Sequence, residues 1–125
     1  MKVSCGTDII EIERIKESIE KLGDAFLNKV YTKNEIAYSE GRGKMKYQHY
    51  AGRFAAKEAI FKAVSGLLNG QTMNFTDAEV LNDESRKPRV TLLNNVKLEK
   101  IIDISISISH CREYAVANVV VLMEE

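Results

Sequence analysis

Apolar residues recur along this chain with two different periods, one in its first half and another in its second. In the stretch that starts at Glu11 they stand three or four positions apart, at Ile12, Ile15, Ile19 and Leu22. This spacing predicts an amphipathic helix that ends at Gly23. Ahead of this helix, Lys2 to Ile10 mixes Val, Ile, Cys and Thr, a composition that favours a short strand.

Three further helices are expected before the period changes. Asp24 to Val30 and Asn34 to Ser39 read as short helical pieces, and Thr32 with Glu35 three positions later forms a predicted capping box. The longest helix is expected from His49 or Tyr50 to Leu68, ended by Asn69-Gly70.

The second half of the chain has the two-residue period of strands. Ile102 to Ser109 alternates apolar and polar residues, so its isoleucines are expected to face a core, and Tyr114 to Met123 follows after a short connection. Phe75 to Leu81 and Arg89 to Leu93 flank a turn-rich link and are expected to pair as a hairpin. The sequence therefore predicts one α+β domain over residues 1–125, with an antiparallel sheet packed against the long helix.

Composition narrows the function classes. Eighteen Lys and Arg balance eighteen Asp and Glu, which argues against a general nucleic-acid binder, because such a protein carries a basic field. The longest apolar runs, such as Val119 to Met123, are about five residues, far short of the roughly 20 that span a bilayer. Without a signal-peptide pattern or a C-x-x-C spacing, we expect a cytoplasmic protein whose Cys5 and Cys111 are reduced and half-buried.

The predicted long helix has three kinds of surface at about 100° per residue. Its expected core face comprises Phe54, Ile60, Phe61, Val64, Leu67 and Leu68. A second arc carries only small side chains, at Ala55, Ala56, Ala59 and Ala63, so another backbone or a ligand can approach closely there. Glu58 and Lys62 lie between these arcs, one turn apart, where the ordinary interpretation is an exposed ion pair.

Cations cluster around this helix although the chain is neutral overall. The segment from Arg42 to Lys62 contains one anion, Glu58, and six cations: Arg42, Lys44, Lys46, Arg53, Lys57 and Lys62. Such a segment can bind phosphate groups, with Arg suited to bidentate contacts and Lys to point-charge contacts. A solvated loop and helix surface is an equally good interpretation.

Asp8 and Glu58 are candidate ligands for a hard cation. Mg²⁺ is commonly held by one or two carboxylates, with phosphate oxygens and waters as its other ligands. Spacing alone leaves a helix cap or turn as the commoner role for Asp8. His110, at the end of the serine-rich strand, can donate to a phosphate or simply be exposed in a hairpin. A Ser-His nucleophile is excluded because neighbouring residues in a strand point to opposite faces.

Three stretches together resemble a known enzyme family. They are Gly6-Thr7-Asp8, the helical segment Arg53 to Lys62, and Ile106-Ser107-Ile108-Ser109-His110. Their order and spacing resemble the short bacterial 4'-phosphopantetheinyl transferases, the holo-(acyl carrier protein) synthases, and the resemblance covers nearly the whole chain. It departs from the family where Glu84 to Pro88 lacks the glycine that many members place just before Lys-Pro.

The resemblance implies a magnesium-dependent transferase of fatty acid biosynthesis. The 4'-phosphopantetheine arm of coenzyme A would pass to a serine of apo acyl carrier protein, releasing adenosine 3',5'-bisphosphate. Asp8 and Glu58 match the family's magnesium ligands, and Lys62 matches its pyrophosphate-contacting lysine. Arg53 and His110 match positions near the nucleotide and its 3'-phosphate.

Further roles follow from the same resemblance. Glu58, directly or through a metal-bound water, is the first candidate for the base that accepts the serine proton, and Asp8 is the second. Arg14 matches the carrier-binding arginine of the docking helix. The family places its active sites between the subunits of a homotrimer, which would account for the alanine arc. Lys57 belongs to the motif, with a structural or interface role equally open.

Two other classes of function stay open at this point. One is a catalytically silent module that binds coenzyme A or a nucleotide through the basic segment. The other is a structural oligomerisation domain that uses the alanine arc. A silent binding module would not transfer phosphopantetheine to apo carrier protein. A structural domain would not be stabilised by coenzyme A with Mg²⁺.

Overall fold

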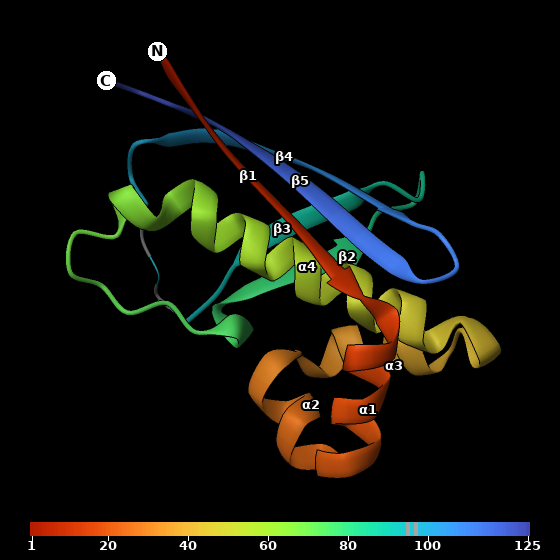
Figure 1. The fold of residues 1–125 in the computed structure, drawn as a ribbon. Coiled ribbons are helices and arrows are strands. Elements are labelled where there is room, and N and C mark those ends of the chain that lie inside the picture. Colours follow the sequence, from red (N-terminus) through yellow and green to blue (C-terminus); the bar gives the residue numbers. More distant parts are fainter. Residues whose placement is uncertain (95, 97) are drawn as a thin grey trace.

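A long helix packed against antiparallel strands forms the framework of the protein, as the sequence predicts (Figure 1). The structure is a computed structural model that describes residues 1–94, 96 and 98–125. The helices are α1 (Ile12–Leu22), α2 (Asp24–Val30), α3 (Lys33–Glu40) and α4 (Lys46–Val64), with 3₁₀ turns at Gly43–Met45, Ser65–Leu67 and Phe75–Asp77. The strands are β1 (Lys2–Glu11), β2 (Ala78–Asn82), β3 (Pro88–Leu92), β4 (Ile101–His110) and β5 (Tyr114–Met123).

The strands form two antiparallel sheets. The larger sheet has the order β1-β5-β4, so β5 pairs with both of its neighbours, while β2 and β3 form a separate hairpin. Helix α4 crosses the inner face of the larger sheet, and α1 to α3 gather at one end of it (Figure 1). The two edge strands β1 and β4 therefore lie along opposite flanks of α4.

Strand β4 has the predicted alternation with one irregularity. Ile104, Ile106 and Ile108 are half-buried, and the serines between them are exposed. Ile102 was also expected to face the core, but 46% of it is exposed. The pairing of β4 with β5 shifts register between Ile101 and Asp103, and such an irregularity changes which face the side chains occupy.

The alanine arc is covered inside a single copy of the chain. Ala55, Ala56 and Ala59 have no exposed surface, and Ala63 is 4% exposed. Strand β1 crosses α4 so closely that a Cβ at Gly6 would lie 1.9 Å from the Ala59 carbonyl oxygen. The expected close approach of another backbone is therefore confirmed. The backbone is that of β1 in the same chain, so the arc does not account for a contact with another subunit.

Several predicted boundaries are corrected. Helix α4 begins at Lys46 and ends at Val64, where the 3₁₀ turn Ser65–Leu67 replaces the predicted last turn. Phe75–Asp77 is also a 3₁₀ turn, so the hairpin strand begins only at Ala78. The Asp77 carboxylate accepts from the Asn74 backbone N–H at 2.7 Å, which stabilises the turn.

Both cysteines were expected to be half-buried. Cys5 and Cys111 are free, as a reduced pair requires, but both are exposed. Cys5 lies on the outer face of β1, the face away from α4, because it follows the strand's two-residue period beside inward-facing Gly6.

A buried ion pair ties α3, α4 and the hairpin together. The predicted capping box is confirmed, with Glu35 accepting from the Thr32 backbone N–H at 2.8 Å. The same carboxylate accepts from the Val80 N–H at 2.8 Å and contacts the Lys57 Nζ at 2.7 Å. Lys57 is 1% exposed and also donates to the carbonyl oxygens of Phe75 and Ala78. Of the roles left open for Lys57, the structural one is confirmed.

Among the described residues, no helix is long and apolar enough to cross a lipid bilayer.

Candidate active site

The predicted acidic pair meets on one flank of α4, beside the edge strand β1. Asp8 follows Gly6 by two residues, so it faces α4 from the same side of the strand. Glu58 and Lys62 are one helical turn apart on α4 and share a face. The Lys62 Nζ donates to Asp8 Oδ1 at 3.0 Å and to the Thr7 carbonyl oxygen at 2.9 Å. Three residues from two distant segments are thus brought together, as the sequence predicts.

The ion pair on this flank differs from the expected one. Lys62 pairs with Asp8, and within the described ranges no ion pair joins Lys62 to Glu58. The Asp8 side chain is 18% exposed and that of Lys62 is 54% exposed. The ammonium group can therefore be reached by a ligand from solvent while it neutralises an acidic site.

The electrostatics of this flank favour a bound cation. Partial burial raises the pKa of Glu58 above its usual value, the charge of Asp8 raises that pKa further, and Lys62 lowers it. A cation beside Glu58 would favour its charged form.

The donor set also fits a divalent metal with a phosphate-bearing substrate. Within residues 1–94, 96 and 98–125, no cluster of three or more His, Cys, Asp and Glu side chains is arranged to hold a metal. Asp8 and Glu58 supply only two protein ligands. That number suits Mg²⁺, which usually keeps waters and takes substrate phosphate oxygens as its remaining ligands.

Arg53 and His110 meet on the other flank of α4. Together with His49 and Arg86 they line a cavity of about 160 Å³ between α4, the end of β4 and the β2–β3 turn. The His49 and His110 rings, from the only two histidines of the chain, lie 6.1 Å apart. The structure therefore pairs Arg53 with His110, as the nucleotide-binding expectation requires.

Arg53 is held rigidly in this cavity. Its side chain is 3% exposed, its guanidinium lies 4.1 Å from the centroid of the Tyr38 ring, and its Nη2 donates to Asn82 Oδ1 at 3.0 Å. Burial lowers the pKa of Arg53, and the Tyr38 and Glu35 side chains oppose that shift. Sequence reasoning missed Tyr38 and Asn82, because both contacts come from distant segments that no helical or strand period relates to Arg53.

The two groups lie on opposite sides of the same helix. Lys62 follows Arg53 by nine residues, which is about half a turn out of phase. Lys62 accordingly contacts β1, whereas Arg53 faces the cavity beside β4. A single copy of the chain therefore does not gather Asp8, Glu58 and Lys62 with Arg53 and His110 in one pocket.

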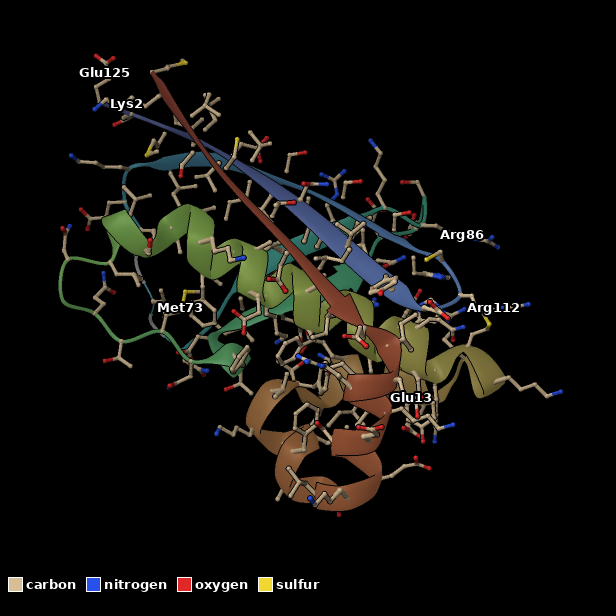
Figure 2. The ribbon with its side chains drawn as sticks, in the orientation of Figure 1. Lys2, Glu13, Met73, Arg86, Arg112 and Glu125 are labelled. Carbon is tan, nitrogen blue, oxygen red and sulfur yellow. The ribbon has the colours of Figure 1, made fainter. Side chains whose placement is uncertain are left out.

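Arg14 lies at a third location, on the exposed face of α1. Its side chain is 71% exposed, and its Nε lies 3.6 Å from Glu11 Oε1. Glu13, which is labelled in Figure 2, precedes Arg14 in the same helix. An exposed, weakly paired arginine is free to contact an acidic partner.

The glycine-lacking turn before Lys87-Pro88 has an unusual backbone. Arg86 adopts a φ of 65°, which a residue with a Cβ rarely takes. In Figure 2 the labelled Arg86 and Arg112 both lie toward the end of the sheet where β4 connects to β5.

Comparisons with known proteins agree with the resemblance seen in the sequence. The family model of the 4'-phosphopantetheinyl transferase superfamily matches residues 4–119. The chain is 48% identical to a holo-[acyl-carrier-protein] synthase of Ruminiclostridium cellulolyticum, over 97% of this chain and 92% of the relative.

Solved structures agree as well. The fold is similar to a holo-(acyl-carrier-protein) synthase from Bacillus anthracis in complex with CoA, with a TM-score of 0.78 and 38% identity over 97% of this chain and 96% of that one. It is also similar to a Chronobacterium ammoniagenes ACPS–CoA complex, with a TM-score of 0.83 and 31% identity over all of both chains.

Proposed function

Since this chain belongs to the 4'-phosphopantetheinyl transferase superfamily, we propose that it transfers the 4'-phosphopantetheine group of coenzyme A to a serine of apo acyl carrier protein. The reaction is magnesium-dependent and releases adenosine 3',5'-bisphosphate. The observation that carries the proposal is the meeting of Asp8, Glu58 and Lys62 on one flank of α4.

Asp8 and Glu58 are the residues that would hold Mg²⁺. When bound there, the ion supplies charge neutralisation for the pyrophosphate of coenzyme A. Burial raises the pKa of Glu58 and the charge of Asp8 raises it further, and a bound cation would oppose both effects, which supports this role.

Glu58 is also our first candidate for the general base. A carboxylate with a raised pKa holds a proton more tightly, and is therefore better suited to take the proton of the serine hydroxyl. The serine Oγ forms a bond to the phosphorus attached to pantetheine as the bond from that phosphorus to the bridging oxygen breaks. Asp8 is the second candidate for this base.

Lys62 stabilises the departing phosphate. Its ammonium group is more than half exposed and lies 3.0 Å from Asp8 Oδ1, so a pyrophosphate that reaches the carboxylates also reaches the ammonium. A positive charge fixed where negative charge develops lowers the barrier without reorganisation.

The nucleotide end of coenzyme A binds at Arg53 and His110, supplied by a second copy of the chain. These residues lie on the opposite side of α4 from Lys62, which supports a site completed by a second copy. We therefore propose a homotrimer whose active sites lie between subunits, a head-to-tail arrangement that closes a ring.

An exposed apolar strip supports this assembly. It lies on the outer face of the larger sheet, away from α4, where Val3 and Ile9 are 61% and 63% exposed and Val120 is 42% exposed. The pairing of β1 with β5 places Val3 opposite Leu122 and Ile9 opposite Val116. The exposed Thr7 and Asn118 pair lies between these two apolar ends of the strip, and exposed apolar surface at either end is available to a partner.

The carrier protein docks on α1 through Arg14. An exposed arginine suits an acidic carrier surface, and electrostatic complementarity mainly raises the association rate. We place the reaction in the cytoplasm, where the two exposed free cysteines stay reduced.

A transfer assay tests the proposal. The protein is incubated with coenzyme A, Mg²⁺ and apo acyl carrier protein, and the carrier is weighed by mass spectrometry. We expect one phosphopantetheine per carrier, no transfer with EDTA, and at least a roughly 100-fold loss of rate in Glu58→Ala.

The same assay identifies the rival function. Saturable coenzyme A binding without any gain of carrier mass would show a silent binding module. Rates close to those of the unaltered protein in Glu58→Ala would remove the proposed metal and base site.

A further inference from the structure

Arg53 and Lys57 are two buried cations of α4, and different kinds of group hold them. Lys57 is paired with the Glu35 carboxylate, whereas the Arg53 guanidinium lies against the ring of Tyr38. We propose that Tyr38 is a positioning residue, which keeps Arg53 charged and oriented for coenzyme A without contacting the coenzyme itself. This inference rests on the proposed function and adds a residue on which its substrate binding depends.

The two contacts lie side by side between α3 and α4. Glu35 and Tyr38 are three residues apart on α3 and share one face of that helix. Arg53 and Lys57 are four residues apart on α4 and likewise share a face. The Glu35 carboxylate is fixed by the Thr32 capping box and by its 2.7 Å contact with the Lys57 Nζ. The buried ion pair therefore also fixes where α3 places the Tyr38 ring.

An aromatic ring stabilises the guanidinium of Arg53 without cancelling its charge. The guanidinium carbon lies 4.1 Å from the centroid of the Tyr38 ring, and the electron-rich face of such a ring attracts a cation. Within the part of the chain that the structure describes, no carboxylate forms an ion pair with Arg53. A carboxylate at this place would neutralise the cation, as Glu35 does for Lys57. Arg53 keeps the positive charge that an anionic ligand needs.

This support matters because Arg53 is withdrawn from water. The residue is 3% exposed, and burial lowers the pKa of its guanidinium, a shift that the Tyr38 and Glu35 side chains oppose. A buried cation that lost such a neighbour would be held less firmly in its charged form and in its orientation.

Tyr38 acts from outside the cavity. The described residues that line the cavity beside Arg53 include His49 and Asn82 but not Tyr38. The Arg53 Nη2 donates to Asn82 Oδ1 at 3.0 Å, whereas the Arg53 Nε has no hydrogen-bond partner among the described residues. Asn82 and Tyr38 together fix the plane of the guanidinium, and this plane determines where its remaining donors point.

The Tyr38 ring is itself held in place by two further side chains. The Arg42 guanidinium carbon lies 4.2 Å from the centroid of the ring, and the His49 ring lies 5.4 Å away in an edge-to-face arrangement. These contacts come from segments on both sides of the 3₁₀ turn at Gly43–Met45, so they keep the ring in one position against Arg53.

Steady-state kinetics of phosphopantetheine transfer tests the role of Tyr38. The full-length protein is assayed at saturating apo acyl carrier protein while the concentration of coenzyme A is varied. Tyr38→Leu removes the ring, and we expect the KM for coenzyme A to rise roughly tenfold with kcat changed less than about twofold. The reason for this split is that Arg53 binds the nucleotide end, away from the reacting phosphorus. Tyr38→Phe keeps the ring and should retain a KM within about threefold of the unaltered protein.

Tyr47→Leu is the matched control. Tyr47 is also half-buried, and the Lys46 Nζ lies 5.2 Å from the centroid of its ring, but it does not line the cavity. The KM for coenzyme A should stay within about twofold in this variant. Thermal unfolding checks that every variant is folded, and Tyr38→Gln replaces Tyr38→Leu if the latter does not fold.

A double-mutant cycle separates positioning from a general structural effect. If Tyr38 acts through Arg53, Tyr38→Leu should raise the KM by less than about twofold in a protein that already carries Arg53→Ala. A loss of structure would instead multiply the effects of the two substitutions.

Three results overturn the positioning role while the transfer activity stands. They are an unchanged KM in Tyr38→Leu, a Tyr38→Phe variant as impaired as Tyr38→Leu, and equal effects of Tyr38→Leu with and without Arg53. If the unaltered protein does not modify the carrier at all, the proposed function fails, and the positioning role fails with it.

Discussion

Glu58 is the side chain whose behaviour depends most on its neighbours. Burial and the Asp8 carboxylate both disfavour its charge, and only the Lys62 ammonium opposes them. The charged Glu58 side chain therefore destabilises the folded protein when no cation is bound, and it can serve as a ligand when a cation is present.

We expect Glu58→Gln to alter how stability depends on pH. The pKa of Glu58 is higher in the folded protein than its usual value of 4.5, so the folded state binds the proton more tightly than the unfolded state does. The stability of the protein therefore falls as the pH rises above 4.5. The variant lacks this loss, so its melting temperature relative to the unaltered protein should increase from about pH 4 to about pH 7. Thermal unfolding across this range measures the difference.

Two controls accompany this measurement. The exposed Glu13→Gln should show no such trend, and added Mg²⁺ should stabilise the unaltered protein but not Glu58→Gln. A variant that is less stable than the unaltered protein at pH 7 without metal contradicts the assignment.

Lys57, in contrast, is a charged residue that stabilises the fold through its buried ion pair with Glu35. Lys57→Met would leave the Glu35 carboxylate buried and unpaired, and we expect a loss of about 3 to 5 kcal/mol in the free energy of unfolding. Lys62→Met makes the same change at an exposed position of the same helix and should cost less than about 1 kcal/mol. Urea denaturation of both variants measures these values, and equal losses would refute the distinction.

Sequence reasoning identified Asp8, Glu58 and Lys62 as neighbours through the family resemblance, and it left Lys57 open. The helical angle placed Lys57 near the core face, but its partner Glu35 lies 22 positions earlier and served in the sequence only as a capping residue. Contacts between distant segments carry no periodic signal. The packing of α3 on α4 decides them.

At the scale of elements, the crossing of β1 over α4 positions the acidic site. The β1 backbone lies against the alanine arc at Gly6, and this contact sets how far Asp8 stands from Glu58 and Lys62. A strand with any larger side chain at this position would be held away from the helix.

We expect Gly6→Ala to be strongly destabilising. Its Cβ would lie 1.9 Å from the backbone oxygen of Ala59, which cannot move without shifting the helix, so the cost should reach about 3 kcal/mol or more. Chemical denaturation measures it. Gly66→Ala, where no atom lies within 4 Å of the added Cβ, should change stability by less than about 0.5 kcal/mol. Similar stabilities of the two variants would contradict the crossing.

The sequence predicts the start of a helix where a local cap defines it, as Thr32 does for α3. It does not predict the start of α4, because Lys46, Tyr47 and Gln48 show no apolar spacing. Phe75 has the composition of a strand residue, but the Asn74 and Asp77 capping box folds its segment into a turn. Local hydrogen bonds outweigh composition at such positions.

At the scale of the whole molecule, Lys62 and Arg53 lie on opposite sides of α4, and this placement supports the proposal that one coenzyme contacts two copies of the chain. The nine-residue spacing already places Arg53 and Lys62 on opposite sides of the predicted helix. The sequence analysis instead based the shared site on the family resemblance and the alanine arc. The alanine arc gives no argument for the shared site, because the alanines are covered within one copy.

Mixing two inactive variants tests the shared site. Glu58→Ala and His110→Ala change opposite flanks, so a mixed oligomer contains some sites in which both residues are intact. With random mixing, one half times one half, or about a quarter, of the sites should be active. The transfer assay on co-refolded protein measures this recovery, and activity no higher than the mean of the two variants would place both residues in one copy.

Strand β5 lies between β1 and β4, although it follows every other element in the sequence. Until β5 has been synthesised, β1 and β4 have no hydrogen-bonding partner in their sheet, and the two faces of α4 that they border stay exposed. Folding must then join the beginning of the chain to residues more than a hundred positions away, which slows it. The ribosome thus releases a nascent chain whose sheet assembles only after the central strand has emerged, and any truncation that removes this strand leaves two unpaired edges open to aggregation.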